Sequence, residues 1–195
     1  MPKQITLTTR KQLDIYMNPQ RQRLLKAMDI HAAPMTPKQL SSHLGISASS
    51  VSHHLKKLEE LDLVGLDHTE SIRGIQAKYY KRLPVVINLG SDKDDDLKEE
   101  RTLLSDYCMN ETWKSFKEHM EQLNDRTNPL ETGDVMNGIL YLTQEEAEQL
   151  KALILGFYSR HMEPAPGTVP WETAIIAFPH KAYPAEKTIP KNAED

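Results

Sequence analysis

The stretch that decides the fold is SASSVSHHLKKLEEL, residues 47–61. Its apolar residues return at intervals of four, three and three positions, which is the period of an α-helix with one buried face. These residues are Val51, Leu55, Leu58 and Leu61. The other positions therefore present small hydroxyl groups, imidazole rings and two ammonium groups on the outer face. The pattern predicts an amphipathic helix whose outer face can approach another polymer closely and donate hydrogen bonds to it.

Two shorter helices are predicted before this one. Asn18 is a good N-cap for a first helix, and Thr36 with Gln39 forms a capping box that opens a second. Gly45 follows the second helix at the place where a left-handed residue can end it. Two helices that meet at such a turn indicate a helix-turn-helix, in which residues 47–61 form the second helix.

The periodicity changes after residue 61. β-favouring residues lie on both sides of a polar stretch with Gly74 near its tip, which predicts a β-hairpin over residues 63–83. Three helices followed by a hairpin make a winged helix, and a helix-turn-helix places its second helix in the major groove of DNA. We therefore expect a mostly α-helical chain with a small β content.

Residues 14–82 resemble the winged helix-turn-helix of ArsR-type bacterial transcriptional regulators. The most specific part is VSHHLKKLEELDLV, residues 51–64, because its serine, histidine and leucine spacing matches the recognition helix of that family. In the family the outer residues of this helix contact the operator. The resemblance carries that role to four positions of this sequence: Ser49, Ser50, Ser52 and His53.

Further DNA contacts are expected around the recognition helix. Lys56 and Lys57 lie one turn further along and would reach backbone phosphate. Thr36 and Lys38, at the front of the preceding helix, would touch the backbone as well. Arg73 matches the wing position at the hairpin tip and would enter the minor groove or pair with phosphate.

Several of these positions have a simpler interpretation. Ser47 is a candidate DNA contact, but as the residue before the helix it is better placed as a cap. His54 lies beside the apolar stripe, where an edge of the core explains it better than base contact. Lys56 and Lys57 could also be solvated surface lysines, like most others.

Composition places the chain in a reducing compartment. Cys108 is the only cysteine, which excludes an internal disulfide and a cysteine-rich metal site. The N-terminal residues contain no apolar signal-peptide core, and no stretch approaches the roughly 18 apolar residues that a spanning helix needs. We expect a soluble, cytoplasmic protein that does not contact a membrane.

The net charge of -4 hides an asymmetry between the two halves. Residues 1–82 hold 13 Lys and Arg against 7 Asp and Glu, while residues 83–195 hold 11 against 21. Phosphate contacts require cations only locally, so a basic first half is compatible with DNA binding despite the acidic total. Such an imbalance also arises by chance.

Residues 84–195 are predicted to form a second region after a DNA-binding domain at residues 1–83. Three of its segments favour strands: residues 85–90, 138–143 and 173–178. Two favour helices: residues 94–123, with acidic residues in the first turn, and residues 144–162, opened by a capping box. We expect a small α/β or helical unit here, with a proline-rich tail.

This second region is expected to hold two copies together. Its LYLT and QEEAEQL motifs, residues 140–150, are similar to a segment that follows the winged helix in larger ArsR-like regulators, and the resemblance implies dimerisation. A two-fold dimer would present two recognition helices about one DNA turn apart. Alternatively, residues 144–161 pack entirely within one chain. A small-molecule effector could bind here, but nothing in the residues identifies it.

No metal, cofactor or catalytic site is predicted. Paired cysteines are absent near the recognition helix, and neither His119 nor His161 has a second ligand one helical turn away. The chain also lacks a glycine-rich phosphate loop, a GxSxG elbow, an HExxH pair and a Cys/His nucleophile arrangement. We therefore do not expect an enzyme.

The sequence predicts a transcriptional regulator that reads double-stranded DNA as a homodimer and acts as a repressor. The alternative is a winged-helix protein-interaction module, in which the acidic second half docks a basic partner. Protein-binding surfaces favour exposed aromatic or aliphatic anchors, whereas the recognition face shows Ser, His and Lys. That difference favours DNA.

Overall fold

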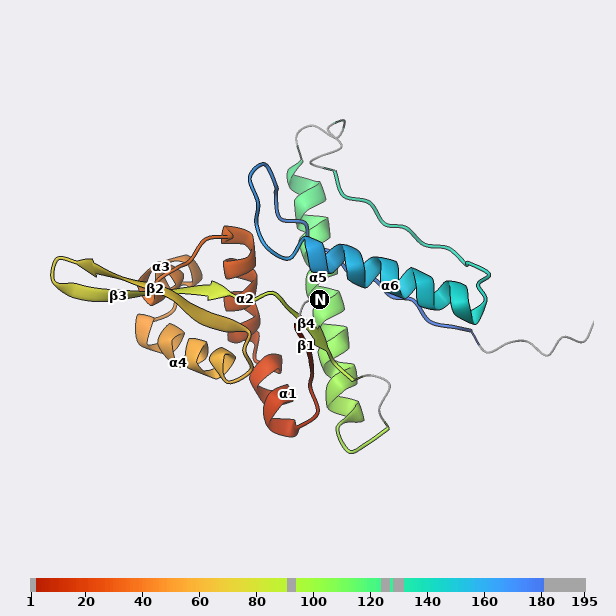
Figure 1. Cartoon of the computed structure of the whole chain (residues 1–195), viewed down its shortest axis with the longest axis horizontal. Coiled ribbons are helices and arrows are strands. Elements are labelled where there is room, and N and C mark those ends of the chain that lie inside the picture. Colours follow the sequence, from red (N-terminus) through yellow and green to blue (C-terminus); the bar gives the residue numbers. More distant parts are fainter. Residues whose placement is uncertain (1–2, 91–93, 124–126, 128–131, 181–195) are drawn as a thin grey trace, which may run out of the picture.

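The computed structural model describes residues 3–90, 94–123, 127 and 132–180, and these are mostly helical with a small β content (Figure 1). In chain order the elements are β1 (Lys3–Thr6), α1 (Arg10–Met17), α2 (Pro19–His31), α3 (Pro37–Leu44), α4 (Ala48–Glu59), β2 (Val64–Ile72), β3 (Ile75–Arg82), β4 (Val85–Asn88), α5 (Lys98–Gln122) and α6 (Gln144–Arg160). The predicted fold class is confirmed.

The helix boundaries of the winged helix lie where local chemistry places them. The Asn18 side chain accepts hydrogen bonds from the backbone amides of Gln20 and Arg21 at the start of α2. Thr36 and Gln39 form the expected capping box before α3. Gly45 ends α3 in the left-handed conformation, with φ of +69°. The backbone therefore turns between α3 and α4 as predicted.

The apolar stripe of α4 is buried. Val51, Leu55 and Leu58 are at most 1% exposed, and Leu61 just after the helix is 6% exposed. They join a core supplied by α2, α3 and the first residues of the hairpin, including Leu24, Leu25, Met28, Leu40, Leu44, Leu63 and Val64. Burying side chains of this size supplies roughly 1.5–3 kcal/mol each, which holds α4 firmly on the domain.

The wing is the antiparallel pair β2 and β3, joined by a two-residue turn. Both turn residues have positive φ, +52° at Arg73 and +82° at Gly74, the pattern of a type I′ turn. The pairing is shifted by a bulge between Leu66 and His68. At its base, Met35 forms an isolated antiparallel bridge with Tyr80, which ties the segment before α3 to the hairpin.

A strand and a helix precede the segment in which the sequence predicted the first helix. β1 pairs in parallel with β4, from Lys3 opposite Val85 to Thr6 opposite Asn88. Between them in sequence, α1 opens with a capping box of Thr9 and Gln12. A second cluster of buried residues forms where these elements meet α5: Leu7, Leu13 and Leu104. The predicted strand at residues 85–90 is confirmed as β4. Its partner strand, β1, comes from the first residues of the chain.

The predicted boundary between residues 83 and 84 stays a prediction. β4 and the start of α5 follow that boundary in sequence, yet they pack on β1 and α1. Figure 1 shows α5 crossing close to this sheet, with α6 beyond it.

The two long helices of the second region are confirmed, with α5 starting four residues later than predicted and α6 opened by the Thr143 and Glu146 capping box. The strands predicted at residues 138–143 and 173–178 are wrong, because both segments have irregular backbone and exposed side chains. A strand requires a neighbour to complete its backbone hydrogen bonds, and neither segment has one within the described chain. Of the α/β or helical unit expected here, the structure has the helical form.

Candidate nucleic-acid interface

The outward face of α4 is built by the burial of its opposite face. Because Val51 and Leu55 point into the core, Ser49, His53 and Lys56 are exposed on the outside. Ser50 and Ser52 are half-buried at the edges of that face. Of the predicted contact residues on this helix, the structure therefore presents Ser49, His53 and Lys56 most openly.

The serine hydroxyls at the start of α4 have different tasks. Ser47 is the N-cap: its Oγ accepts a hydrogen bond of 3.1 Å from the amide of Ser50. The same oxygen lies 3.0 Å from the Oγ of Ser49. Ser52 donates to the carbonyl of Ala48 at 2.8 Å, one turn back along the helix. Ser49 is therefore the exposed hydroxyl that can turn toward a ligand without uncapping the helix.

The two neighbouring lysines of α4 are in different electrostatic environments. Lys57 Nζ pairs with Glu60 at 2.7 Å, and Lys11 Nζ reaches the same carboxylate at 2.8 Å. Hydrogen bonds from these two lysines lower the pKa of Glu60 to about 2, so the carboxylate stays ionised at neutral pH. Lys56 is exposed and forms no ion pair with the described residues. Lys56 is thus the freer cation of the two.

The adjacent histidines also differ. The rings of His53 and His54 are 5.6 Å apart in an edge-on arrangement, with His53 exposed and His54 half-buried. The Nδ1 of His54 is buried and has no hydrogen-bond partner among the described residues. Burial, then the charges of Arg21 and His53, lower the pKa of His54, so it is neutral at pH 7. His54 lies at the edge of the core, and His53 faces solvent.

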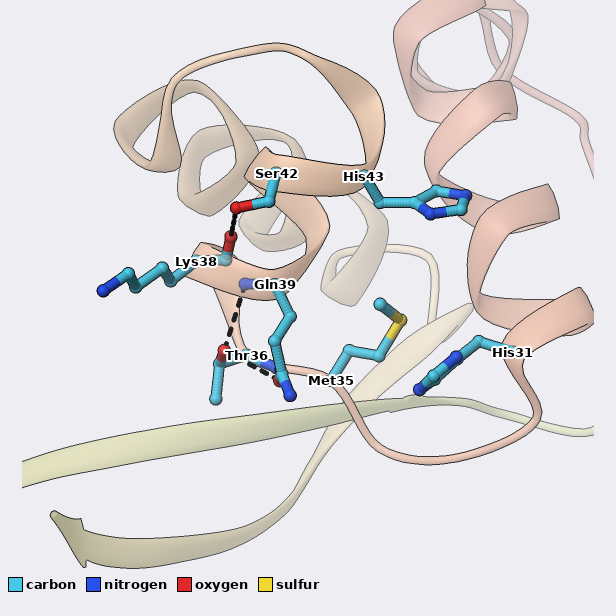
Figure 2. Close-up of a pocket in the computed structure, with 7 residues that line it drawn as sticks. All are labelled: His31, Met35, Thr36, Lys38, Gln39, Ser42 and His43. Atoms are coloured by element: carbon cyan, nitrogen blue, oxygen red, sulfur yellow. Dashed lines mark hydrogen bonds between the residues drawn. The ribbon is translucent and has the colours of Figure 1, made fainter.

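The front of α3 carries the other predicted backbone contacts. Figure 2 shows Thr36 and Gln39 bonded to each other in the capping box, while the Lys38 side chain extends away from the helix. Thr36 Oγ1 accepts from the amide of Gln39 at 3.2 Å and donates to its side-chain oxygen at 2.9 Å. The Lys38 amine is therefore free to approach a phosphate, whereas the Thr36 hydroxyl already caps its helix.

An open hollow lies between the end of α2 and α3. Its lining includes Thr36, Lys38 and Ser42 from the front of α3, together with Met35 and two histidines, His31 and His43 (Figure 2). In Figure 2 the Met35 thioether lies between the polar groups at the front of α3 and the His31 imidazole, and the Lys38 side chain extends away from the hollow.

The wing carries the predicted Arg73 and an exposed cation that was not predicted, Lys78. Arg73 is exposed at the tip, and Lys78 is exposed on β3 opposite Thr69. Lys81 instead pairs with Asp67 at 2.9 Å, where hydrogen bonds from Lys81 and His68 lower the pKa of the carboxyl. Lys78 was not predicted as a contact, although the alternation of side chains along a strand places it on one face of the hairpin.

These groups gather at one end of the molecule. In Figure 1 the wing extends from the end that carries α3 and α4, and α6 lies on the far side of α5. The structure thus brings the α3 front, the outer face of α4 and the hairpin into one region, as a winged helix requires for contact with DNA.

Metal-ligand clusters and membrane-spanning helices are both absent from the described residues. No group of three or more His, Cys, Asp or Glu side chains there is arranged to hold a metal ion. None of the helices in the same part of the chain is both long and apolar enough to cross a membrane.

Comparison with known proteins identifies the helix-turn-helix. Residues 18–65 match the family model of bacterial regulatory proteins of the arsR family. This segment is an ArsR-type helix-turn-helix. The match runs from the N-cap residue of α2 to the second residue of β2 and so contains all of α3 and α4.

The ArsR-type segment covers only part of the chain, and no curated protein matches the sequence. Among solved structures, a possible transcriptional regulator from Methanosarcina mazei Go1 is 14% identical, with 53% of this chain and 80% of that chain covered and a TM-score of 0.33. The adhesin competence repressor AdcR from Streptococcus pyogenes is 13% identical, with 76% and 83% covered and a TM-score of 0.31. A MepR mutant from S. aureus is 18% identical, with 77% and 84% covered and a TM-score of 0.31. At these TM-scores the ArsR-type assignment depends on the family match alone.

Proposed function

We propose that this chain is a sequence-specific DNA-binding transcriptional regulator that acts as a dimeric repressor. The observation that carries the proposal is the outer face of α4. It is the second helix of an ArsR-type helix-turn-helix, its apolar side is fully buried, and its exposed side presents Ser49, His53 and Lys56. Small polar side chains on a rigidly held helix can approach base edges closely.

The residues divide into base and backbone contacts. Ser49 and His53 meet base edges in the major groove, because they are exposed and can donate or accept hydrogen bonds. Ser50 and Ser52 lie at the margins of this contact. Lys56, and Lys38 at the front of α3, neutralise phosphates, while Arg73 reaches the backbone or the minor groove from the wing. Ser47 and Thr36 cap the helices that carry these contacts, and Lys57 supports them from its ion pair with Glu60.

A repressor role is what a two-fold dimer bound at a promoter would produce. A two-fold dimer places two copies of α4 on half-sites about one DNA turn apart, and a protein held there excludes polymerase from a promoter that contains the site. A small-molecule effector would release it only by binding one dimer geometry more tightly than the other.

The test is binding to a fluorescent fragment of the promoter beside the gene that encodes this chain, compared with random DNA of equal length. The variant is Ser49→Ala with His53→Ala, and the matched control makes the same two changes on α5, at Ser105 and His119. Losing base contacts worth about 1–3 kcal/mol should weaken specific binding by about 5–150-fold. Binding to random DNA should change little.

The alternative, a protein-interaction module, has one observation in its favour. The second region exposes large apolar side chains, among them Trp171, Ile176 and Phe178. They lie away from α4, so a protein partner bound there would leave the outer face of α4 unused. The same measurement separates the two functions: equal affinity of the double variant and the parent chain for every DNA tested would contradict the proposal and favour the module.

A further inference from the structure

The hairpin of the wing ends in two exposed isoleucines. Ile72 and Ile75 stand on either side of the two-residue turn and pair directly with each other. Their side chains therefore lie on the same face of the hairpin, where they are 44% and 73% exposed. In Figure 1 the tip of the hairpin projects beyond α3 and α4. Two branched apolar side chains thus stand at the end of an arm that extends away from the core.

The core of the winged helix does not require this pair to be apolar. The buried cluster takes Leu63 and Val64 from the start of the hairpin, and Tyr80 packs against it from β3. Branched side chains at the tip favour the strand conformation, but threonine satisfies that preference with less apolar surface. The apolar character of Ile72 and Ile75 is therefore available for a contact outside the chain.

The charges around the isoleucines favour DNA as that contact. Arg73 is exposed between them, and no acidic residue separates them from the turn. The two carboxylates of β2 are both engaged nearer the base of the hairpin: Asp67 pairs with Lys81 at 2.9 Å, and Glu70 accepts a hydrogen bond from the Tyr79 hydroxyl. A cation beside an exposed apolar side chain is the combination with which minor-groove proteins open a base step.

The arm is long enough to reach a minor groove. β2 has nine residues and so extends over about 26 Å. The centre of the major groove and that of the next minor groove are about 17 Å apart, half a turn of DNA. Val64, at the start of β2, shares a buried cluster with Leu55 and Leu58 of α4. With α4 in the major groove, the tip of the wing therefore reaches the adjacent minor groove.

The base of the arm is braced. Met35 and Tyr80 exchange two backbone hydrogen bonds, each of 2.9 Å, which tie β3 to the segment before α3. The rings of His68 and Tyr79 stack across the hairpin with their centroids 4.4 Å apart. Side chains that separate stacked bases must hold their position against resistance, and these contacts supply the necessary stiffness.

The composition of α4 leaves room for a second source of specificity. Arg, Asn and Gln make the bidentate contacts that discriminate bases most strongly, and Ala48–Glu59 contains none of them. We propose that Ile72 and Ile75 form a wedge that enters the minor groove beside the α4 site, opens a base step and kinks the DNA. Pyrimidine–purine steps such as TA and CA open most easily, so the chain should prefer them at that position. The inference rests on the proposed function and adds DNA bending to it.

The first test measures bending of duplexes that the parent chain selects from a random-sequence pool, by energy transfer between dyes at their two ends. The parent should bend them by about 20–90°. Ile72→Thr with Ile75→Thr keeps the branched shape but removes apolar surface. This variant should leave the duplex nearly straight and bind it about 10-fold more weakly. The matched control, Ile139→Thr with Ile176→Thr at 71% and 67% exposure, should bend DNA as the parent does.

The second test uses DNA in which the step is already loosened. One mismatched pair at the selected pyrimidine–purine step weakens its stacking, so the parent should bind this duplex at least about 5-fold more tightly than the matched one. The double threonine variant should gain nothing from the mismatch. Ile75→Leu keeps an apolar tip and should behave as the parent does.

The outcomes separate the wedge from the proposed function. A duplex that the parent leaves straight, or equal bending by the parent and the folded threonine variant, overturns the wedge while sequence selection through Ser49 and His53 stands. Equal affinity of the parent for the matched and mismatched duplexes also overturns it, and that measurement requires no variant to fold. A parent chain that selects no sequence from the pool overturns both. Circular dichroism and urea denaturation establish that each variant is folded.

Discussion

Lys56 and Lys57 show how neighbouring residues of one type can differ in what they are free to do. The Lys57 amine is held by Glu60, whose charge is also shared with Lys11. The Lys56 amine is exposed and has no such pair among the described residues. A lysine that must break an ion pair before it contacts a phosphate gains less binding free energy than a lysine that is only solvated.

We therefore predict different salt dependences for the two alanine variants. Lys56→Ala should reduce the slope of log K against log salt for duplex DNA by about 0.9, which corresponds to one lost phosphate contact. Lys57→Ala, the matched control, should change it by clearly less. Fluorescence anisotropy between 50 and 200 mM salt, about the range over which phosphate contacts are most visible, measures both slopes. A larger effect from Lys57→Ala would contradict the assignment of Lys56 as the free cation.

The wing contains a residue, Arg73, that suits the proposed DNA contact better than it suits the turn in which it lies. Arg73 occupies the first central position of the turn with φ of +52°, a conformation that costs an ordinary side chain roughly 1 kcal/mol. Asn adopts this conformation more readily, and Asn-Gly is the preferred pair for a two-residue hairpin turn. Arg73 therefore stands where a more stable turn residue is available, and its charge is exposed at the tip.

Arg73→Asn should separate folding from binding. We expect the free energy of unfolding to stay equal or to rise by a few tenths of a kcal/mol, because Asn suits the turn. DNA affinity should fall, with a salt slope smaller by about 0.9 if the guanidinium pairs with one phosphate. Urea denaturation and anisotropy measure the two effects on one protein sample. Unchanged affinity in a folded variant would show that the wing tip does not touch DNA.

The whole molecule is held together across the predicted domain boundary. Leu104 of α5 is 1% exposed and packs with Leu7 and Leu13, which come from the first residues of the chain. Nearby, the buried guanidinium of Arg101 pairs with Asp95 at 2.5 Å. On α2, Lys26 reaches Glu172 at 2.9 Å, a contact between the winged helix and the C-terminal segment. The contact of Leu104 with Leu7 and Leu13 packs the first half of α5 on the N-terminal elements, and the Lys26–Glu172 pair joins α2 to the C-terminal segment.

Two neighbouring leucines of α5 test whether this helix unfolds together with the N-terminal elements. Leu104→Ala should lower the free energy of unfolding by about 2–5 kcal/mol through lost burial and the cavity left behind. Leu103→Ala, at 62% exposure, should stay within about 0.5 kcal/mol of the parent. Urea unfolding is followed by circular dichroism of all helices and by tryptophan fluorescence, with Trp171 replaced by Phe in every variant so that Trp113 on α5 is the fluorophore. Equal stability of the two variants, or separate transitions for the two signals, would mean that α5 unfolds on its own.

Much of the winged helix is predictable from the sequence because its signals are local. The N-cap at Asn18, the capping box of Thr36 and Gln39 and the left-handed Gly45 each act on backbone groups within a few residues. The buried stripe of α4 requires only the helical period of one segment. The buried face of a helix determines which positions face outward, so the exposure of Ser49 and His53 also follows from the sequence.

The tertiary structure decided what depends on partners distant in the chain. β1 exists because β4, some eighty residues later, completes its hydrogen bonds, whereas residues 138–143 have β-favouring side chains but no strand beside them. The difference between Lys56 and Lys57 depends in part on Lys11, which only the fold brings to Glu60. Helix ends and amphipathic faces are properties of one segment, but strands and ion pairs depend on which segments meet in space.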